Sequence, residues 1–239
     1  MIPHRVPSPG RWPMLLVAVF LLAVIPGANA EEPAPIQPTL VFDNTYGGPD
    51  AERGIFVTEV KGGGFIAVGS TRSSGEGEED VYLVRTDAQG QELWSATFGG
   101  SAPDFGWSVC EVADGFVIAG FTESFGEGEN DFYLVKTTRE GDEVWSRTFG
   151  GEGNDRCWAL TPTADGGLLL VGETTSFGAG EQDVHLVKTD AQGDVQWSKT
   201  HGGEKSDRVF AVALADDGFV LAGQTYSEGE GDRDAYVIK

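Results

Sequence analysis

The sequence from Gly120 to Asp131 reads GFTESFGEGEND. Its pattern, G-x-T-x-S-x-G-x-G-x-x-D, returns from Gly172 to Asp183 and from Gly223 to Asp234, and it also fits Gly69 to Asp80. Each copy is preceded by a pair of glycines, and successive pairs lie 52, 51 and 52 residues apart, beginning at Gly47, Gly99, Gly150 and Gly202. Four copies at a nearly constant period identify a repeat protein whose unit has about fifty residues.

Each unit is expected to contain four short strands, which the third copy shows most clearly. Arg156 to Thr163 precedes an Asp-Gly-Gly turn signal, and Leu168 to Glu173 is a continuous apolar run that suits a strand buried on both faces. Asp183 to Lys188 and Val195 to His201 flank a second turn signal that ends in glycine. No helical period of apolar residues follows residue 30, so the sequence predicts an all-β domain.

Four-stranded units that are apolar on both faces are typical of the blades of a β-propeller. The blades are expected at about 50–98, 99–149, 150–201 and 202–239. The last unit lacks a fourth strand, whereas Leu40 to Tyr46 aligns with the fourth strands and places Phe42 at their tryptophan position. We therefore expect four four-stranded blades, with residues 40–48 completing the last one by pairing with Tyr236 to Lys239.

The second copy carries a resemblance to known proteins. It reads YLVKT from Tyr133 to Thr137, has Gly141 in the following turn, and continues as WSRTFGG from Trp145 to Gly151. This copy resembles the bacterial and archaeal extracellular β-propeller repeat proteins and is similar, more distantly, to the pyrroloquinoline-quinone-type propellers. The resemblance covers residues 40–239 and implies a scaffold or interaction domain. The cofactor and metal residues of the quinone enzymes match no positions here.

The first thirty residues have the layout of a secretory signal peptide. Arg5 and Arg11 supply positive charge, Met14 to Ile25 is apolar, and Ala28-Asn29-Ala30 offers small residues at a cleavage site. The apolar run has twelve residues, fewer than the roughly twenty that a membrane-spanning helix needs. We expect a signal peptide over 1–30, a linker over 31–39, and a secreted protein, extracellular or periplasmic, with no membrane insertion after cleavage.

The mature chain would be strongly acidic. Removal of Arg5 and Arg11 leaves 14 basic residues against 38 acidic ones, a formal charge of −24. Nucleic acids and anionic membranes are bound by cationic groups, so this charge argues against a nucleic-acid partner. Divalent cations, basic proteins and neutral glycans stay open, and the charge also serves solubility by itself.

Two series of acidic residues recur in loops that a propeller places on one face of the disk. One series precedes each first strand and the other precedes each third strand: Glu52, Asp104, Asp155 and Asp207, and Asp80, Asp131, Asp183 and Asp234. One interpretation is a metal site for a hard cation such as Ca²⁺, which prefers several carboxylate oxygens. The other, favoured by recurrence in every copy, is that the acids fix the turns by accepting hydrogen bonds from loop amides, with Arg53, Arg156 and Arg208 as partners.

Aromatic residues divide into two groups. Trp94, Trp145 and Trp197 recur in one register and are interpreted as packing residues. Other aromatics break the repeat and are candidates for ligand binding: Phe125, Phe177, Trp107 and Trp158. Rings beside carboxylates can stack on sugars, although filling the gaps between blades is the favoured alternative.

Catalysis has little support in the sequence. His185 replaces the tyrosines Tyr82, Tyr133 and Tyr236, which indicates a packing role, and no nucleophile motif adjoins it. Cys110 and Cys157 stand four residues apart in register, so we expect two free thiols. The prediction is a non-catalytic interaction module that binds a protein or glycan, and the alternative is an enzyme dependent on calcium or a quinone.

Overall fold

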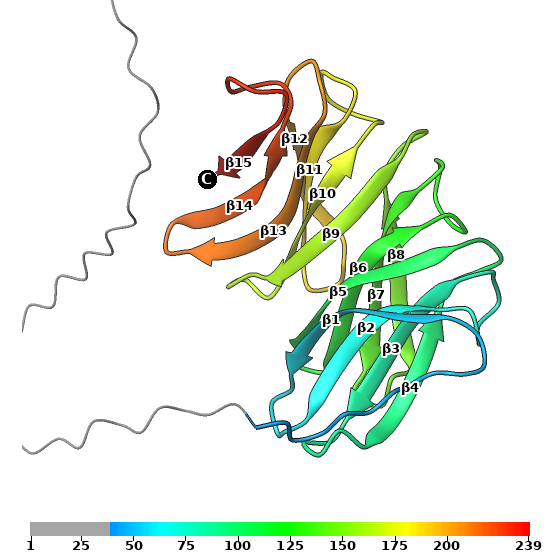
Figure 1. The fold of residues 1–239 in the computed structure, drawn as a ribbon. Helices are drawn as coiled ribbons and strands as arrows, with labels where there is room; N and C mark the ends of the chain where they lie inside the picture. Colours follow the sequence, from blue (N-terminus) through cyan, green and yellow to red (C-terminus); the bar gives the residue numbers. More distant parts are fainter. Residues whose placement is uncertain (1–38) are drawn as a thin grey trace, which may run out of the picture. The chain divides into compact units, whose positions relative to one another are not determined.

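The computed structural model describes residues 39–239, and this part of the chain consists of fifteen β-strands joined by turns and loops (Figure 1). It contains no helix that could cross a membrane. The expected signal peptide and nearly all of the linker lie outside the described residues. Leu40–Lys239 forms one unit by its internal contacts, and the prediction of an all-β domain over this range is confirmed.

The strands form four antiparallel sheets in chain order. The first sheet contains β1 (Glu52–Glu59), β2 (Phe65–Thr71), β3 (Asp80–Thr86) and β4 (Glu92–Phe98). The second contains β5 (Asp104–Val112), β6 (Gly115–Thr122), β7 (Asp131–Thr138) and β8 (Glu143–Phe149). The third contains β9 (Asp155–Pro162), β10 (Leu168–Thr174), β11 (Asp183–Thr189) and β12 (Val195–His201). The last contains β13 (Asp207–Ala215), β14 (Gly218–Thr225) and β15 (Asp234–Ile238).

Every sheet is a meander in which each strand pairs with the next one along the chain. The strands of the third sheet begin and end within one residue of their predicted positions. The first strand of every sheet carries a register shift after its third residue pair, for example between Gly54 and Phe56. Such bulges increase the local twist of a strand, and their recurrence shows that the four sheets share one backbone design.

The hydrophobic core lies between consecutive sheets. One cluster joins the first sheet to the second, and two further clusters join the second to the third and the third to the last. Ile66, Val68, Val81 and Leu83, for example, pack against Val109, Phe116, Ile118, Tyr133 and Val135. A sheet between two others therefore buries both faces, as the continuous apolar run of β10 requires.

The recurring tryptophans pack across these junctions. A Cβ added at Gly141 would lie 2.8 Å from the ring of Trp94, and one added at Gly193 would lie equally close to Trp145. Both glycines have positive φ, so the turn between the third and fourth strands of one sheet offers a flat site for the tryptophan of the preceding sheet. The predicted packing role of these tryptophans is confirmed.

The expected closing strand is not formed. β15 pairs with β14 alone, so the last sheet has three strands, and Leu40–Tyr46 contains no strand. This segment instead covers the first sheet. The rings of Phe42 and Phe65 lie 5.8 Å apart, and Asn44 Nδ2 and Tyr46 Oη donate hydrogen bonds to the Gly90 carbonyl at 2.7 and 2.6 Å.

The reason is the placement of the sheets. The substantial contacts between sheets all join consecutive ones, and Figure 1 shows the first and last sheets at the two ends of the series. A strand whose apolar side chains cover the first sheet cannot also reach β15. The prediction that residues 40–48 complete the last blade of the same chain is therefore not met among the described residues.

Candidate functional site

The acidic residues before the first strands serve the loops around them. Asp104 Oδ2 accepts hydrogen bonds from Gly100 N at 2.8 Å and Ser124 Oγ at 2.7 Å. Asp155 and Asp207 accept the equivalent bonds in the next two sheets, and Glu52 accepts one from Thr71 Oγ1 at 2.9 Å. Each acid thus joins its own loop to the loop that follows the second strand of the same sheet.

The aspartates before the third strands also accept backbone amides. Asp131 Oδ2 receives Glu127 N and Gly128 N, both at 3.0 Å, and Asp183 Oδ2 receives Ala179 N and Gly180 N at 2.9 and 3.0 Å. Asp80 and Asp234 each receive one such bond. These contacts agree with the turn-fixing interpretation of the acids.

Acids of the two series meet in pairs where one sheet follows another. Gly150, in the link between the second and third sheets, lies next to one carboxylate of each sheet. A Cβ at this position would lie 2.0 Å from Asp131 Oδ1 and 2.7 Å from Asp155 Oδ2. Gly99 and Gly202 are flanked in the same way by Asp80 with Asp104 and by Asp183 with Asp207. Burial raises the pKa of Asp131, and the neighbouring Asp155 raises it further.

This arrangement does not fit a calcium site. Ca²⁺ takes about six to eight oxygen ligands, and each pair supplies two carboxylates whose Oδ2 atoms are already engaged. Among residues 39–239, no three His, Cys, Asp or Glu side chains are grouped to hold a metal ion. Six of the eight acids predicted as metal ligands are thus brought together in three pairs, and Glu52 and Asp234 stand outside these pairs.

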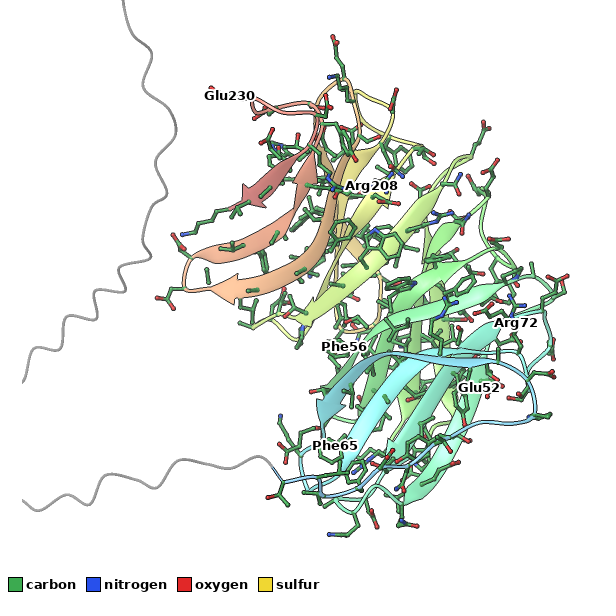
Figure 2. All side chains as sticks on the ribbon, viewed as in Figure 1. Glu52, Phe56, Phe65, Arg72, Arg208 and Glu230 are labelled. Carbon is green, nitrogen blue, oxygen red and sulfur yellow. The ribbon has the colours of Figure 1, made fainter. Side chains whose placement is uncertain are left out.

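The arginines do not pair with these aspartates. Arg208, labelled on β13 in Figure 2, lies 3.3 Å from Glu173 Oε2 through its Nε, and Glu173 is almost completely buried. The guanidinium of Arg156 lies over the ring of Phe121, 5.3 Å from its centroid. Burial raises the pKa of Glu173, although Arg208 opposes the shift.

A pocket of about 380 Å³ lies at the loop end of the junction between the second and third sheets. We call it the junction pocket. Its lining combines two phenylalanines, two carboxylates, a histidine and a serine: Phe149, Phe177, Glu127, Asp131, His185 and Ser198. The loop after β6, the start of β7, the end of β8, the loop after β10, and strands β11 and β12 supply these side chains. Apolar walls with a few polar groups are the usual composition of a small-ligand site.

His185 is the residue that distinguishes this junction from the others. Its side chain is 2% exposed, and Nε2 lies 2.8 Å from Ser198 Oγ. Nδ1 has no hydrogen-bond partner within the described part of the chain. Burial lowers the pKa of His185 to about 4, so the ring is neutral at neutral pH. The sequence showed the break in the tyrosine register but gave it only a packing role, and that break was the signal for the pocket.

Phe177 and Phe125 occupy equivalent loop positions. They are 47% and 45% exposed, and each packs on the strand residue of its own sheet, Phe177 on His185 and Phe125 on Tyr133, with centroid distances of 5.6 and 5.7 Å. Both keep half of their surface free, as a ligand-binding aromatic must. Phe177 lines the junction pocket, so the structure ties one of the two predicted residues to a cavity.

Trp107 and Trp158 form a separate cluster on the first strands of the second and third sheets. Their rings meet edge to face at 4.5 Å, and Phe121 and Phe210 adjoin Trp158 at 5.8 and 6.3 Å. Both tryptophans are partly buried. They are brought together with each other but not with Phe125 and Phe177, so the four predicted aromatics belong to different places in the fold.

Both cysteines are free thiols, as expected. Burial raises the pKa of each to about 12, which leaves little thiolate at neutral pH. Neither cysteine is therefore a candidate nucleophile.

Comparison with known proteins shows a distant similarity. No family model matches the chain. Among curated proteins, the chain is similar to the regulatory protein FlaEY of Caulobacter vibrioides, with 25% identity over 240 residues. The similar region covers 84% of this chain and 24% of FlaEY, so the chain spans about a quarter of the length of that relative.

Proposed function

We propose that the protein is a secreted, non-catalytic interaction module of the β-propeller type and that it binds a glycan in the junction pocket. The four sheets are its blades, because each is a meander of the same repeat and each packs face to face on the next. The similarity to FlaEY, which is named a regulatory protein, agrees with a module that acts by binding.

The junction pocket carries this proposal. Phe177 presents a half-exposed ring at its edge, and Glu127, Asp131 and Ser198 place hydrogen-bonding oxygens around the same cavity. A pyranose ring offers an apolar face for the phenylalanine and hydroxyl groups for the oxygens. The imidazole of His185, which is neutral at neutral pH, lines the same cavity without adding positive charge.

Catalysis has no comparable support. The repeated aspartates accept hydrogen bonds within the loops of every copy, and both cysteines are buried or partly buried thiols with raised pKa values. The nucleophile beside His185 is the Ser198 hydroxyl, and serine also occupies this position in the first two copies, as Ser95 and Ser146. No specific observation favours the alternative of an enzyme dependent on calcium or a quinone.

The repeat supplies a matched pair of variants for the test. We expect neutral oligosaccharides, such as chito-, cello- and manno-oligosaccharides, to include one that binds the purified chain in calorimetry. Phe177→Ala should weaken its binding about tenfold or more, because the stacking surface is lost. Phe125→Ala removes an equally exposed ring from an equivalent loop and should leave the affinity unchanged.

His185→Tyr restores the residue that the other three copies carry. Since Tyr133 occupies the same position next to Ser146, the variant should fold with an unchanged melting temperature while losing the ligand. Equal loss with Phe125→Ala and Phe177→Ala would contradict the pocket. Loss confined to Trp107→Ala would move the site to the tryptophan cluster, and absence of binding to the whole panel would reject the glycan in favour of a protein ligand.

A further inference from the structure

The two ends of the sheet series each leave one sheet face without a partner. In the second sheet the side chains that face the third sheet are Val117, Ala119, Phe132 and Leu134, all of them buried. Their equivalents in the last sheet are Val220, Ala222, Ala235 and Val237, and no sheet within residues 39–239 covers them. Val237 is 69% exposed. We call this surface the trailing face.

The first sheet has the opposite free surface, which we call the leading face. Val57 is 59% exposed there, whereas its equivalent in the second sheet, Val109, is buried against the first sheet. A Cβ at Gly106 would meet Val68 and Val81 of the preceding sheet at 2.5 and 3.0 Å, but one at the equivalent Gly54 would meet nothing within 4 Å. The space that a preceding sheet fills at every other junction is open here.

The leading face also contains a mainly apolar hollow. It has a volume of about 90 Å³ and is lined in part by Ala67, Tyr82 and Val84, the equivalents of Ile118, Tyr133 and Val135 that the first sheet buries at the next junction. Figure 2 labels Phe65 on the same sheet, and its ring lies 5.8 Å from that of Phe42. The trailing and leading faces are therefore the two halves of an interface that the chain builds three times within itself.

The segment Leu40–Tyr46 lies where the fourth strand of a preceding sheet would lie. A Cβ at Gly90 would touch the Phe42 ring at 2.5 Å, just as one at Gly141 would touch Trp94. Asn44 and Tyr46 follow Phe42 at intervals of two and contact the same turn, as expected for one face of an extended segment. Within residues 39–239 no sheet includes this segment as a strand, while β15 presents an edge without a fourth strand.

We propose that a second copy of this chain docks head to tail on the first. The trailing face of one copy covers the leading face of the other, and β15 of the first copy pairs with Leu40–Tyr46 of the second. The repeat register then places Val237 opposite Asn44 and Tyr236 opposite Thr45, as Leu83 lies opposite Ala96 and Tyr82 opposite Thr97. Two such contacts close a ring of two copies with eight sheets, a number within the usual range of about four to eight for propellers.

A second copy is the occupant that satisfies both ends at once. Its surfaces are complementary by repeat equivalence, it removes both exposed faces, and it supplies β15 with the strand that it lacks. The proposal is independent of the junction pocket, which lies between the second and third sheets, so either can fail alone.

A disulfide across the proposed strand pair tests the register. Directly opposed residues on antiparallel strands have Cα atoms about 4.5–5.5 Å apart, within the range that a disulfide spans. Asn44→Cys/Val237→Cys, oxidised with glutathione disulfide, should run as a covalent dimer on a denaturing, non-reducing gel, while each single variant should run at the mass of one chain. A disulfide-locked monomer, or no disulfide in the double variant, would overturn the proposal, because the first outcome means that the chain closes on itself.

Mass in solution tests the faces. By light scattering the full chain should have twice the mass of one copy, and Val237→Glu should reduce it to one copy that keeps the circular dichroism spectrum of a folded β protein, because Val237 is largely exposed in the single chain. Val144→Glu, at a valine that is 53% exposed on β8 and belongs to neither end face, should leave the dimer intact. A monomeric unmodified chain, or a dimer that survives Val237→Glu, is the result that refutes head-to-tail docking.

Discussion

Asp131 and Asp155 belong to consecutive sheets and approach the same glycine, Gly150. The two carboxylate oxygens of Asp155 have different surroundings. Asp155 Oδ2 receives a hydroxyl and an amide, whereas its Oδ1 is buried without a hydrogen-bond partner in the described protein. Sequence reasoning identified these residues as turn acceptors from their recurrence alone. It could not foresee that acids 24 residues apart would be neighbours, because their meeting depends on how one sheet packs on the next.

Neutralising Asp131 and neutralising Asp207 should change the free energy of unfolding in opposite directions. Burial and Asp155 raise the pKa of Asp131, so its charge is disfavoured, and Asp131→Asn keeps an acceptor for the two loop amides. We expect the free energy of unfolding in urea at pH 7 to stay unchanged or to rise by up to about 1 kcal/mol.

Asp207→Asn should act in the other direction. Burial raises the pKa of Asp207, but hydrogen bonds from Ser227, Thr225 and Gly203 together outweigh burial and lower it. Loss of this charged acceptor should cost about 1–3 kcal/mol in the same urea measurement. Equal losses for Asp131→Asn and Asp207→Asn would show that the two acids do not differ in this way.

The pH dependence follows from the same shifts. Because the folded pKa of Asp131 is raised, its ionisation destabilises the fold, and this penalty disappears as the pH falls through that pKa. Any advantage of Asp131→Asn at pH 7 should therefore vanish by low pH. The folded pKa of Asp207 is lowered, so its contribution is complete above the ordinary value and is lost as the pH falls through the folded one. Urea titrations from pH 7 to pH 3 measure both differences, and a pH-independent gap would contradict them.

At the scale of elements, the sequence patterns predicted the positions of the strands well, but the predicted pairing of residues 40–48 with β15 is not formed. The strands of the third sheet are bounded by glycine turns and aspartates, which are local signals, and they appear within one residue of prediction. Phe42 was also placed correctly in the tryptophan register, since it packs on Gly90 as Trp94 packs on Gly141. The position of a segment in the repeat does not determine which sheet it joins. The sequence therefore could not show whether Leu40–Tyr46 pairs with β15 of the same chain.

The packing of tryptophan on a turn glycine predicts a graded effect. Gly62 and Gly141 both have φ near +95°, at +96° and +93°, so an alanine at either pays the same left-handed strain of about 1–2 kcal/mol. At Gly62 nothing lies within 4 Å of the new Cβ, whereas at Gly141 the Trp94 ring lies at 2.8 Å. Gly141→Ala should therefore lower the free energy of unfolding by about 1–3 kcal/mol more than Gly62→Ala, measured in urea. Equal effects would mean that the ring moves aside without cost.

At the scale of the molecule, the number of sheets was readable from the repeat and their closure was not. Each junction depends on side chains that recur, such as Val68 and its equivalents, whereas closure depends on the accumulated angle between sheets, which no residue encodes by itself. The junction pocket likewise depends on how sheets pack and could not be predicted from single residues. Phe177 and the histidine break at His185 were visible in the sequence, but the cavity exists because two neighbouring sheets meet there.

The net charge predicts how the proposed dimer responds to salt. Two chains, each with a formal net charge of −22, repel each other, while the end faces that join them are mainly apolar. Added salt screens the repulsion over about 10 Å at 0.1 M and leaves apolar burial largely unaffected. Raising sodium chloride from about 0.02 to 0.5 M should therefore tighten the dimer several-fold in sedimentation equilibrium. Weakening by salt would indicate that charge pairs rather than apolar sheet faces hold the copies together, because screening weakens attraction between opposite charges.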